Sequence, residues 1–190
     1  GATGETLWMH RYDEGTRGQV APVRASSGRG VAYWTDGAGD DRIIHVTKGY
    51  HLVALSAGTG QPISAFGEQG VVDLYEGLND GLDRPTIEDG QIGLNSPAIV
   101  VGDVIVVGAA LRATAPSQAF PAGFVRGFDV RSGEQLWIFH TIPQPGEFGN
   151  DTWEDDSWRY SGNTGVWAPM SADQELGYVY LPVETPTNDL

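Results

Sequence analysis

The sequence predicts an all-β fold built from repeated four-stranded units, and three observations support this prediction. A turn of the form Thr/Ser-Gly-Glu, followed by a strand with a tryptophan, occurs at residues 3–8 and again at 132–137, with a weaker copy at 59–63. Short apolar runs alternate with turn residues, and long helical periodicity is not found in the sequence. Glycine and proline, 27 and 11 of 190 residues, supply the turns. Such units arranged around an axis form a β-propeller, so we expect part of one.

The expected strands are short and join as antiparallel hairpins. In chain order they cover residues 31–34, 43–46, 51–55, 98–101, 104–107, 125–130, 135–140, 165–170 and 178–183. The innermost hairpins begin near Val31, Ala98 and Val166, at nearly equal steps along the chain. We therefore expect about two to three four-stranded blades, in an incomplete propeller domain over residues 1–190 that begins and ends mid-blade. Trp8 and Trp137 of the repeated motif are expected to pack between adjacent blades.

Composition excludes several classes of function. The net charge is −14, and binding to nucleic-acid phosphates or an anionic membrane surface needs an excess of Lys and Arg, so we expect neither. Because the chain has no cysteine, it has no disulfide framework and no thiolate chemistry. No apolar run approaches the ~18 residues of a membrane span, and no signal peptide is visible.

Three loops interrupt the blade pattern and are candidates for a site. Arg29 lies between two glycines at the start of a strand, where its guanidinium can grip a carboxylate, although a surface arginine in a loose turn fits as well. Residues 146–158 hold three aromatic and five acidic residues, which suits a functional loop or a lid packed on the propeller. Residues 161–169 carry Trp167, which can be a stacking platform for a planar ligand or a core tryptophan between blades.

Other chemistry-bearing residues are expected to be structural. The loop at residues 36–41 has a calcium-like composition, but we interpret it as a hairpin loop. The four histidines (His10, His45, His51 and His140) show no metal-ligand spacing. The sequence shows no Ser-His-Asp constellation, phosphate loop or dinucleotide fingerprint.

Several segments together resemble the dehydrogenases that depend on pyrroloquinoline quinone (PQQ), which include glucose, alcohol and methanol dehydrogenases. The resemblance is carried by residues 29–34, 125–134, 152–158 and 173–182. It implies an eight-bladed propeller with PQQ near the axis and a divalent cation, calcium or magnesium, beside it. It also implies a periplasmic protein that passes electrons to a membrane quinone or a cytochrome c. Any membrane anchor would lie outside this chain.

The resemblance also assigns roles to individual residues. Arg29 matches the arginine that binds the carboxylates of the quinone, and Trp167 matches the tryptophan on which the cofactor stacks. Asn95 or Ser96 falls where a polar side chain contacts the cofactor. Ala110 falls where alcohol dehydrogenases of the family carry a serine that contacts the cofactor. The ligands of the cation are not identified in this sequence: the loop at residues 109–112 has no match for the glutamate of the relatives, and Thr185 aligns with their asparagine.

The expected function is therefore part of a PQQ-dependent oxidoreductase that oxidises an aldose or an alcohol by hydride transfer to PQQ. The aspartate that acts as catalytic base in the family would lie downstream, so no catalytic residue is assigned here, and residues 1–190 alone are expected to be inactive. The alternative is a non-catalytic propeller scaffold that binds proteins, like the outer-membrane assembly lipoproteins built from the same repeat.

Overall fold

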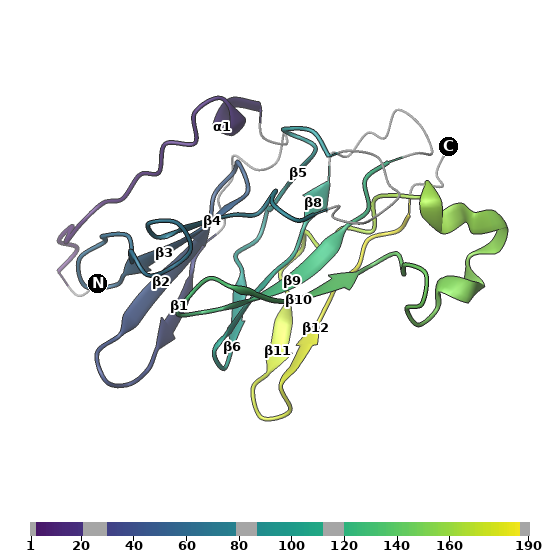
Figure 1. Cartoon of the computed structure of the whole chain (residues 1–190). Helices are drawn as coiled ribbons and strands as arrows, with labels where there is room; N and C mark the ends of the chain where they lie inside the picture. The colour runs from purple at the N-terminus through teal and green to yellow at the C-terminus, as the bar shows by residue number, and fades with distance from the viewer. Residues whose placement is uncertain (1–2, 21–29, 79–86, 112–119, 187–190) are drawn as a thin grey trace.

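The structure is a computed structural model that describes residues 3–20, 30–78, 87–111 and 120–186. Its regular structure is almost entirely β (Figure 1). The first antiparallel sheet has the strand order β1-β2-β3-β4. Its strands are β1 (Ala32–Thr35), β2 (Asp41–Val46), β3 (His51–Ser56) and β4 (Val71–Asp73).

The second antiparallel sheet has the order β10-β9-β7-β6. Its strands are β6 (Ile99–Val101), β7 (Val104–Val107), β9 (Phe124–Asp129) and β10 (Gln135–His140). Two shorter pairs complete the β-structure: β5 (Ile92–Gly93) with β8 (Ala110–Leu111), and β11 (Ser171–Asp173) with β12 (Tyr178–Tyr180). The helical segments are α1 (Arg17–Val20), η2 (Asn150–Thr152) and η3 (Glu154–Arg159).

Successive sheets stand side by side through their first strands. Strand β1 contacts β6, and β6 contacts β11, so the two four-stranded sheets and the β11–β12 pair follow one another as layers (Figure 1). This is how blades are arranged in a propeller. The structure confirms the predicted all-β partial propeller. In the described residues it has two four-stranded sheets, and the β11–β12 pair forms the third layer.

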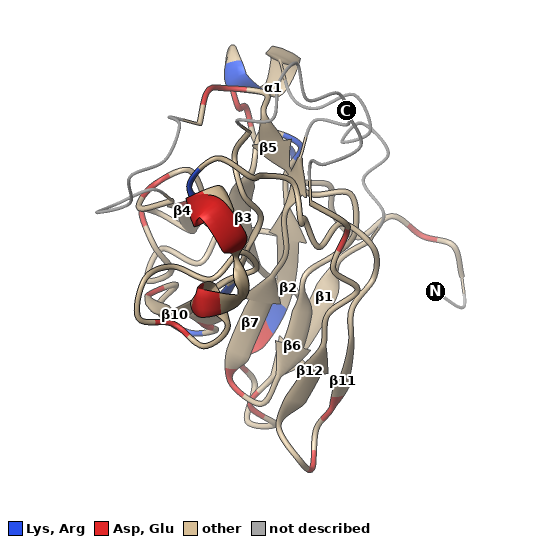
Figure 2. Cartoon of the chain, turned by 90° about the vertical axis from the view of Figure 1, so that its right-hand side faces the viewer, with Lys and Arg blue, Asp and Glu red and all other residues tan. Residues whose placement is uncertain are grey.

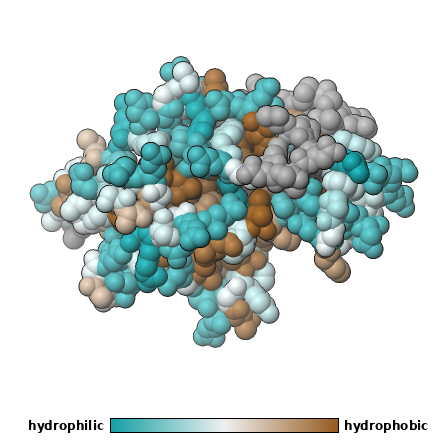
Figure 3. Space-filling view, in the orientation of Figure 1, coloured by the Kyte–Doolittle hydropathy of each residue, from teal (hydrophilic) through white to brown (hydrophobic). Residues whose placement is uncertain are grey.

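The core lies between these layers. One cluster of buried residues, including Trp34, Leu52, Phe66 and Phe128, joins the first two sheets. A smaller cluster, with Val106, Val125 and Val166 at its centre, joins the second sheet to the β11–β12 pair. In Figure 3 hydrophobic residues are visible in the middle of the face, between hydrophilic margins. Burial of these faces is the main force holding the layers together.

Two arginines add polar contacts between the sheets. Arg42 in β2 donates to the carbonyls of Val130 and Arg131, both at 2.8 Å. Arg126 in β9, only 2% exposed, donates to the carbonyls of Leu74 and, at 3.2 Å, Glu76. These side chains satisfy backbone groups that the layered packing removes from water.

The repeated Gly turn is present at all three predicted places. Gly4, Gly60 and Gly133 have φ values of 68°, 70° and 77°, a left-handed conformation that favours glycine. The indole of Trp8 covers Gly60 and donates to the Ala57 carbonyl at 3.0 Å. Trp8 thus packs on the following unit, although residues 4–14 form no strand.

Trp137 takes a different position from the one predicted. Its ring covers Gly127 in the adjacent strand β9 of its own sheet, and 40% of its surface stays exposed. Among the described residues it does not lie between two sheets.

The predicted strand at residues 165–170 is wrong. The strand begins only at Ser171. Before it, Gly165 accepts the N–H of Glu184, beyond β12, while Asn163 makes backbone hydrogen bonds with Pro121 and Gly123 in a separate segment. Strands β4, β5 and β8 and the three short helical segments were not expected from the sequence. No helix within the described residues is long and apolar enough to cross a membrane.

Candidate functional site

The segments that lead into the three innermost strands lie next to one another. A Cβ placed on Gly30, before β1, would lie 3.7 Å from the Pro97 side chain, before β6. The hydroxyl of Ser96 donates to the carbonyl of Ala168, before β11, at 3.3 Å. Propeller topology places equivalent segments of successive blades at the same end of the axis. The contacts therefore build one site from three separate parts of the chain.

Trp167 lies on one of these three segments. Its side chain is 39% exposed, whereas the preceding Val166 is fully buried against Gly108. The segment is thus anchored on both sides of the tryptophan, by Val166 and by the bond from Ser96 to Ala168. A partly exposed indole held in this way can stack against a planar ligand.

Asn95 contributes an unsatisfied polar atom. Its side-chain oxygen Oδ1 is buried and has no hydrogen-bond partner within the described structure. A buried polar atom without a partner is costly, and most such atoms in proteins are satisfied by a protein group, a water or a ligand. The amide oxygen can accept from an N–H or O–H donor or bind a hard cation. Together, Asn95 and Trp167 fit a planar ligand with polar edges.

The structure gives less information on the other two expected site residues, Ser96 and Arg29. Ser96 is 5% exposed, and its hydroxyl is engaged by Ala168, so its observed contact is with the Trp167 segment. Arg29 lies outside the described residues. Its neighbour Gly30 has φ 122° and lies beside Pro97.

The aromatic and acidic segment at residues 146–158 forms its own small lobe. Trp158 is 6% exposed and packs with Ala122 and Ile142, and Trp153 lies against them. The acids Asp151, Glu154, Asp155 and Asp156 are exposed, and Figure 2 shows acidic residues in red on the short helices. The two tryptophans therefore serve packing, which matches the alternative of a segment packed on the propeller.

No metal site is found in the part of the chain that the structure describes: no three His, Cys, Asp or Glu side chains are grouped to hold an ion. In the loop at residues 36–41, the Asp36 carboxylate accepts the backbone N–H groups of Ala38 at 2.7 Å and Asp40 at 3.0 Å. These bonds lower the pKa of Asp36. The loop satisfies its own carboxylate, as the hairpin interpretation expects.

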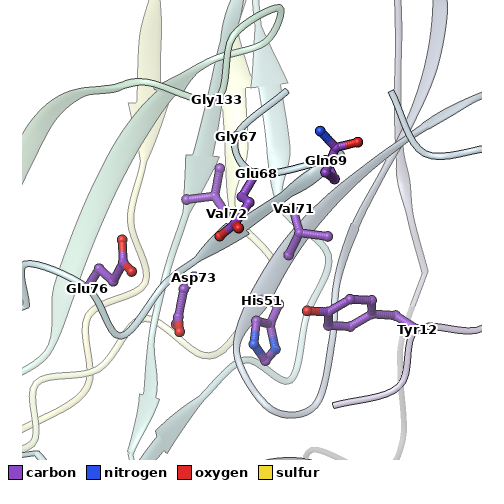
Figure 4. Close-up of a pocket in the computed structure, with 10 residues that line it drawn as sticks. All are labelled: Tyr12, His51, Gly67, Glu68, Gln69, Val71, Val72, Asp73, Glu76 and Gly133. Atoms are coloured by element: carbon purple, nitrogen blue, oxygen red, sulfur yellow. The ribbon is translucent and has the colours of Figure 1, made fainter. Parts of the chain in front are cut away.

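A separate cavity of about 640 Å³ lies at the other strands of the first sheet (Figure 4). His51, Asp73, Glu68 and Glu76 line it, and none of the expected site residues does. Arg17 enters this region and pairs with both carboxylate oxygens of Asp73 at 2.9 Å. Burial raises the pKa of Asp73, but hydrogen bonds from Arg17 and from the Tyr75 backbone outweigh it, so the pKa is lowered overall.

The N-terminal segment is also tied to the first sheet by Glu14. Its carboxylate accepts the backbone N–H of Gly49 at 2.7 Å and contacts His51 Nδ1 at 3.1 Å. Together, Arg17 and Glu14 tie the N-terminal segment to Asp73 and His51, two of the residues that line this cavity. We therefore take the end that carries Trp167 as the candidate functional site.

Comparisons with known proteins agree with the fold. The family model described as "Glucose/ethanol/alcohol dehydrogenase, beta-propeller domain", which carries the name PQQ, matches residues 1–190. The large subunit of glycerol dehydrogenase from Gluconobacter oxydans (strain 621H) is 30% identical over 194 residues, 99% of this chain and 24% of that subunit. The quinoprotein glucose dehydrogenase of Escherichia coli (strain K12) is 31% identical over 153 residues, 78% of this chain and 18% of that enzyme.

A solved structure shows the same fold. The quinohemoprotein alcohol dehydrogenase from Comamonas testosteroni superposes with a TM-score of 0.61 at 20% identity, over 98% of this chain and 26% of that protein. The chain thus spans about a quarter or less of the length of these relatives. It belongs to the family of PQQ-dependent quinoprotein dehydrogenases and forms part of their glucose/ethanol/alcohol dehydrogenase β-propeller.

Proposed function

We propose that the protein containing this chain is a PQQ-dependent dehydrogenase that oxidises an alcohol or an aldose, and that this chain supplies one side of its cofactor site. The proposal is carried by one observation: the exposed indole of Trp167 and the buried, unpartnered Asn95 oxygen lie on two segments that the bond from Ser96 to Ala168 joins. A plain propeller scaffold gives no reason for this pair. The substrate class follows from the relatives, which are named as glycerol, glucose and alcohol dehydrogenases.

Each residue has a distinct role in this proposal. Trp167 stacks against the flat face of the cofactor, and Asn95 offers its free oxygen to a polar edge or to the cation. Ser96 keeps the Trp167 segment in place through its bond to Ala168. Arg29 binds the cofactor's carboxylates, because a guanidinium is suited to a bidentate bond with a carboxylate.

PQQ, when bound, supplies the quinone carbonyl that accepts a hydride from the substrate carbon. A divalent cation, calcium or magnesium, would polarise that carbonyl. We assign no general base to this chain. Since the reaction leaves the cofactor reduced, an acceptor must reoxidise it, and we propose a membrane quinone or a cytochrome c. A periplasmic location would give access to both.

The test is equilibrium dialysis of the full-length protein with PQQ, for the wild type, Trp167→Ala and Trp137→Ala. Trp137 is a matched control, because its exposed fraction is 40% against 39% for Trp167 and it lies on the outer strand β10. We expect Trp167→Ala to weaken binding by about tenfold, equivalent to ~1.4 kcal/mol. Trp137→Ala should leave the affinity unchanged.

Two results would contradict the proposal. Wild-type protein that does not bind PQQ in the presence of calcium or magnesium would favour the scaffold alternative. Equal affinity of the wild type and Trp167→Ala would remove the stacking role. Residues 1–190 alone, supplied with PQQ and calcium, are expected to show no dehydrogenase turnover.

A further inference from the structure

The backbone just before Trp167 has an unusual conformation that sequence reasoning did not identify. Asn163 has φ 63° and Thr164 has φ 54°. Asparagine adopts left-handed conformations fairly often, but a β-branched residue such as threonine rarely does, because its Cβ substituents crowd the backbone. Thr164 is also 4% exposed, so the strain lies inside the protein. Strained backbone of this kind persists only where the surroundings hold it, and it concentrates at functional sites.

The surroundings hold these two residues from several sides. Asn163 donates its backbone N–H to Pro121 at 2.9 Å and its side-chain amide to the Thr185 carbonyl at 2.9 Å. Its own carbonyl accepts the N–H of Gly123 at 2.6 Å. A Cβ on Gly123 would lie 2.5 Å from the Thr164 carbonyl oxygen, so the two backbones approach as closely as glycine allows.

A pair of hydroxyls completes the support. The Thr164 hydroxyl lies 2.9 Å from the hydroxyl of Thr141, which follows β10, and Thr141 donates to the Gly123 carbonyl at 2.7 Å. This pair connects the second sheet to the segment that leads into β11. The Thr164 hydroxyl also donates to the carbonyl of Asn163, at 2.5 Å.

We infer that Thr164 is a positioning residue for the Trp167 platform. The chain is fixed at Thr164, at the fully buried Val166 and at Ala168, whose carbonyl accepts from Ser96. Within residues 164–168, Trp167 alone is exposed, and the residues on both sides of it are held in place. The left-handed turn at residues 163–164 therefore sets the direction in which the indole is presented. This inference rests on the proposed function, because the platform matters only if the cofactor binds there.

The experiment compares five substitutions in the full-length protein. Thr164→Val removes the hydroxyl and keeps the branched shape, whereas Thr164→Ser keeps the hydroxyl. Thr141→Val breaks the same pair from a residue outside the left-handed turn, so it remains informative if Thr164→Val fails to fold. Thr152→Val is the control, since that hydroxyl donates to Gly149 in the exposed acidic lobe.

Three readouts are measured: hydrogen exchange, the dissociation constant of PQQ and the melting temperature. Without PQQ, hydrogen exchange of the peptide covering residues 161–170 should be several-fold faster in Thr164→Val and Thr141→Val. With PQQ, equilibrium dialysis should give a dissociation constant about five- to tenfold higher for both, and near the wild-type value for Thr164→Ser and Thr152→Val. Thr164→Gly distinguishes stability from positioning. Glycine relieves the strained φ, so we expect the melting temperature to stay at the wild-type value while the affinity for PQQ falls.

The inference is overturned if folded Thr164→Val and Thr141→Val exchange and bind PQQ like the wild type. It is also overturned if the Thr164→Gly affinity stays at the wild-type value. Failure of the proposed function looks different, because then the wild type itself does not bind PQQ. The exchange readout without cofactor still decides whether Thr164 holds the Trp167 segment.

Discussion

Individual polar residues of this chain differ in whether the surrounding protein satisfies them. Asn95 keeps a buried oxygen free at the candidate site, and His45 in β2 keeps its ring nitrogen Nδ1 without a partner in the described part of the chain. Asn95 and His45 differ in what the unpartnered atom can do. The Asn95 oxygen can accept from a ligand, whereas His45 lies in a structural strand where burial decides its protonation.

A pH dependence of stability follows from His45. Burial lowers its pKa, with Glu14 opposing the shift and His10 adding to it. The unfolded histidine titrates near ~6.5, so below that pH the unfolded state binds more protons than the folded state until the folded pKa is reached. The contribution of neutral His45 is therefore complete above that pH and is lost as pH falls towards the folded pKa.

The measurement is urea denaturation of the wild type and His45→Asn between pH 7.5 and 5. We expect the free energy of unfolding of the wild type to fall more steeply with decreasing pH than that of the variant. Parallel pH profiles for the two proteins would show that His45 does not contribute to this dependence.

At the scale of elements, the turn glycines both shape hairpins and join sheets. Gly133, between β9 and β10, has φ 77°, and a Cβ there would lie 2.8 Å from the Val72 side chain and 3.0 Å from the Gly67 nitrogen. Ser132 beside it accepts the N–H of Gly67 at 2.8 Å. Gly177, in the β11–β12 turn, has φ 66° but nothing within 4 Å of such a Cβ. The two glycines thus share a conformation and differ in their neighbours.

Alanine substitution separates these two requirements. Gly177→Ala should cost about 1 kcal/mol, because only the left-handed conformation is penalised. Gly133→Ala should cost a further ~1–3 kcal/mol, because its methyl group also overpacks the contact between sheets. Chemical denaturation of both variants measures the difference, and equal losses would show that the Gly133 turn does not pack tightly on the first sheet.

The same elements show how far the sequence predicts the structure. The repeated Gly turns and the hairpins around Gly102 and Gly133 could be predicted, because their signals are local. The irregular stretch before β11 could not, since Asn163 bonds to Pro121 and Gly123 in a distant segment, and no local pattern shows this. Asn95 and Trp167 were expected at the site from the family resemblance. The role of Thr164 could not be predicted, because it depends on a left-handed backbone conformation that threonine rarely adopts.

At the scale of the whole molecule, layered sheets bring separate segments to one end. Arg42 and Arg126 and the apolar cores between sheets fix neighbouring layers. The order of the layers then brings together the segments that carry Gly30, Asn95 and Trp167, although more than sixty positions separate each residue from the next in the sequence. Such convergence of loops on a rigid frame is how propellers commonly build binding sites.

The central claim is that this end of the propeller forms one side of a PQQ site. A crystal structure of the full-length protein with PQQ bound tests it most directly. We predict a planar cofactor stacked on the Trp167 indole, with Asn95 Oδ1 within hydrogen-bonding or coordination distance of the cofactor or its cation. PQQ bound elsewhere, such as in the cavity beside His51 and Asp73, with Trp167 free of contact, would contradict the account.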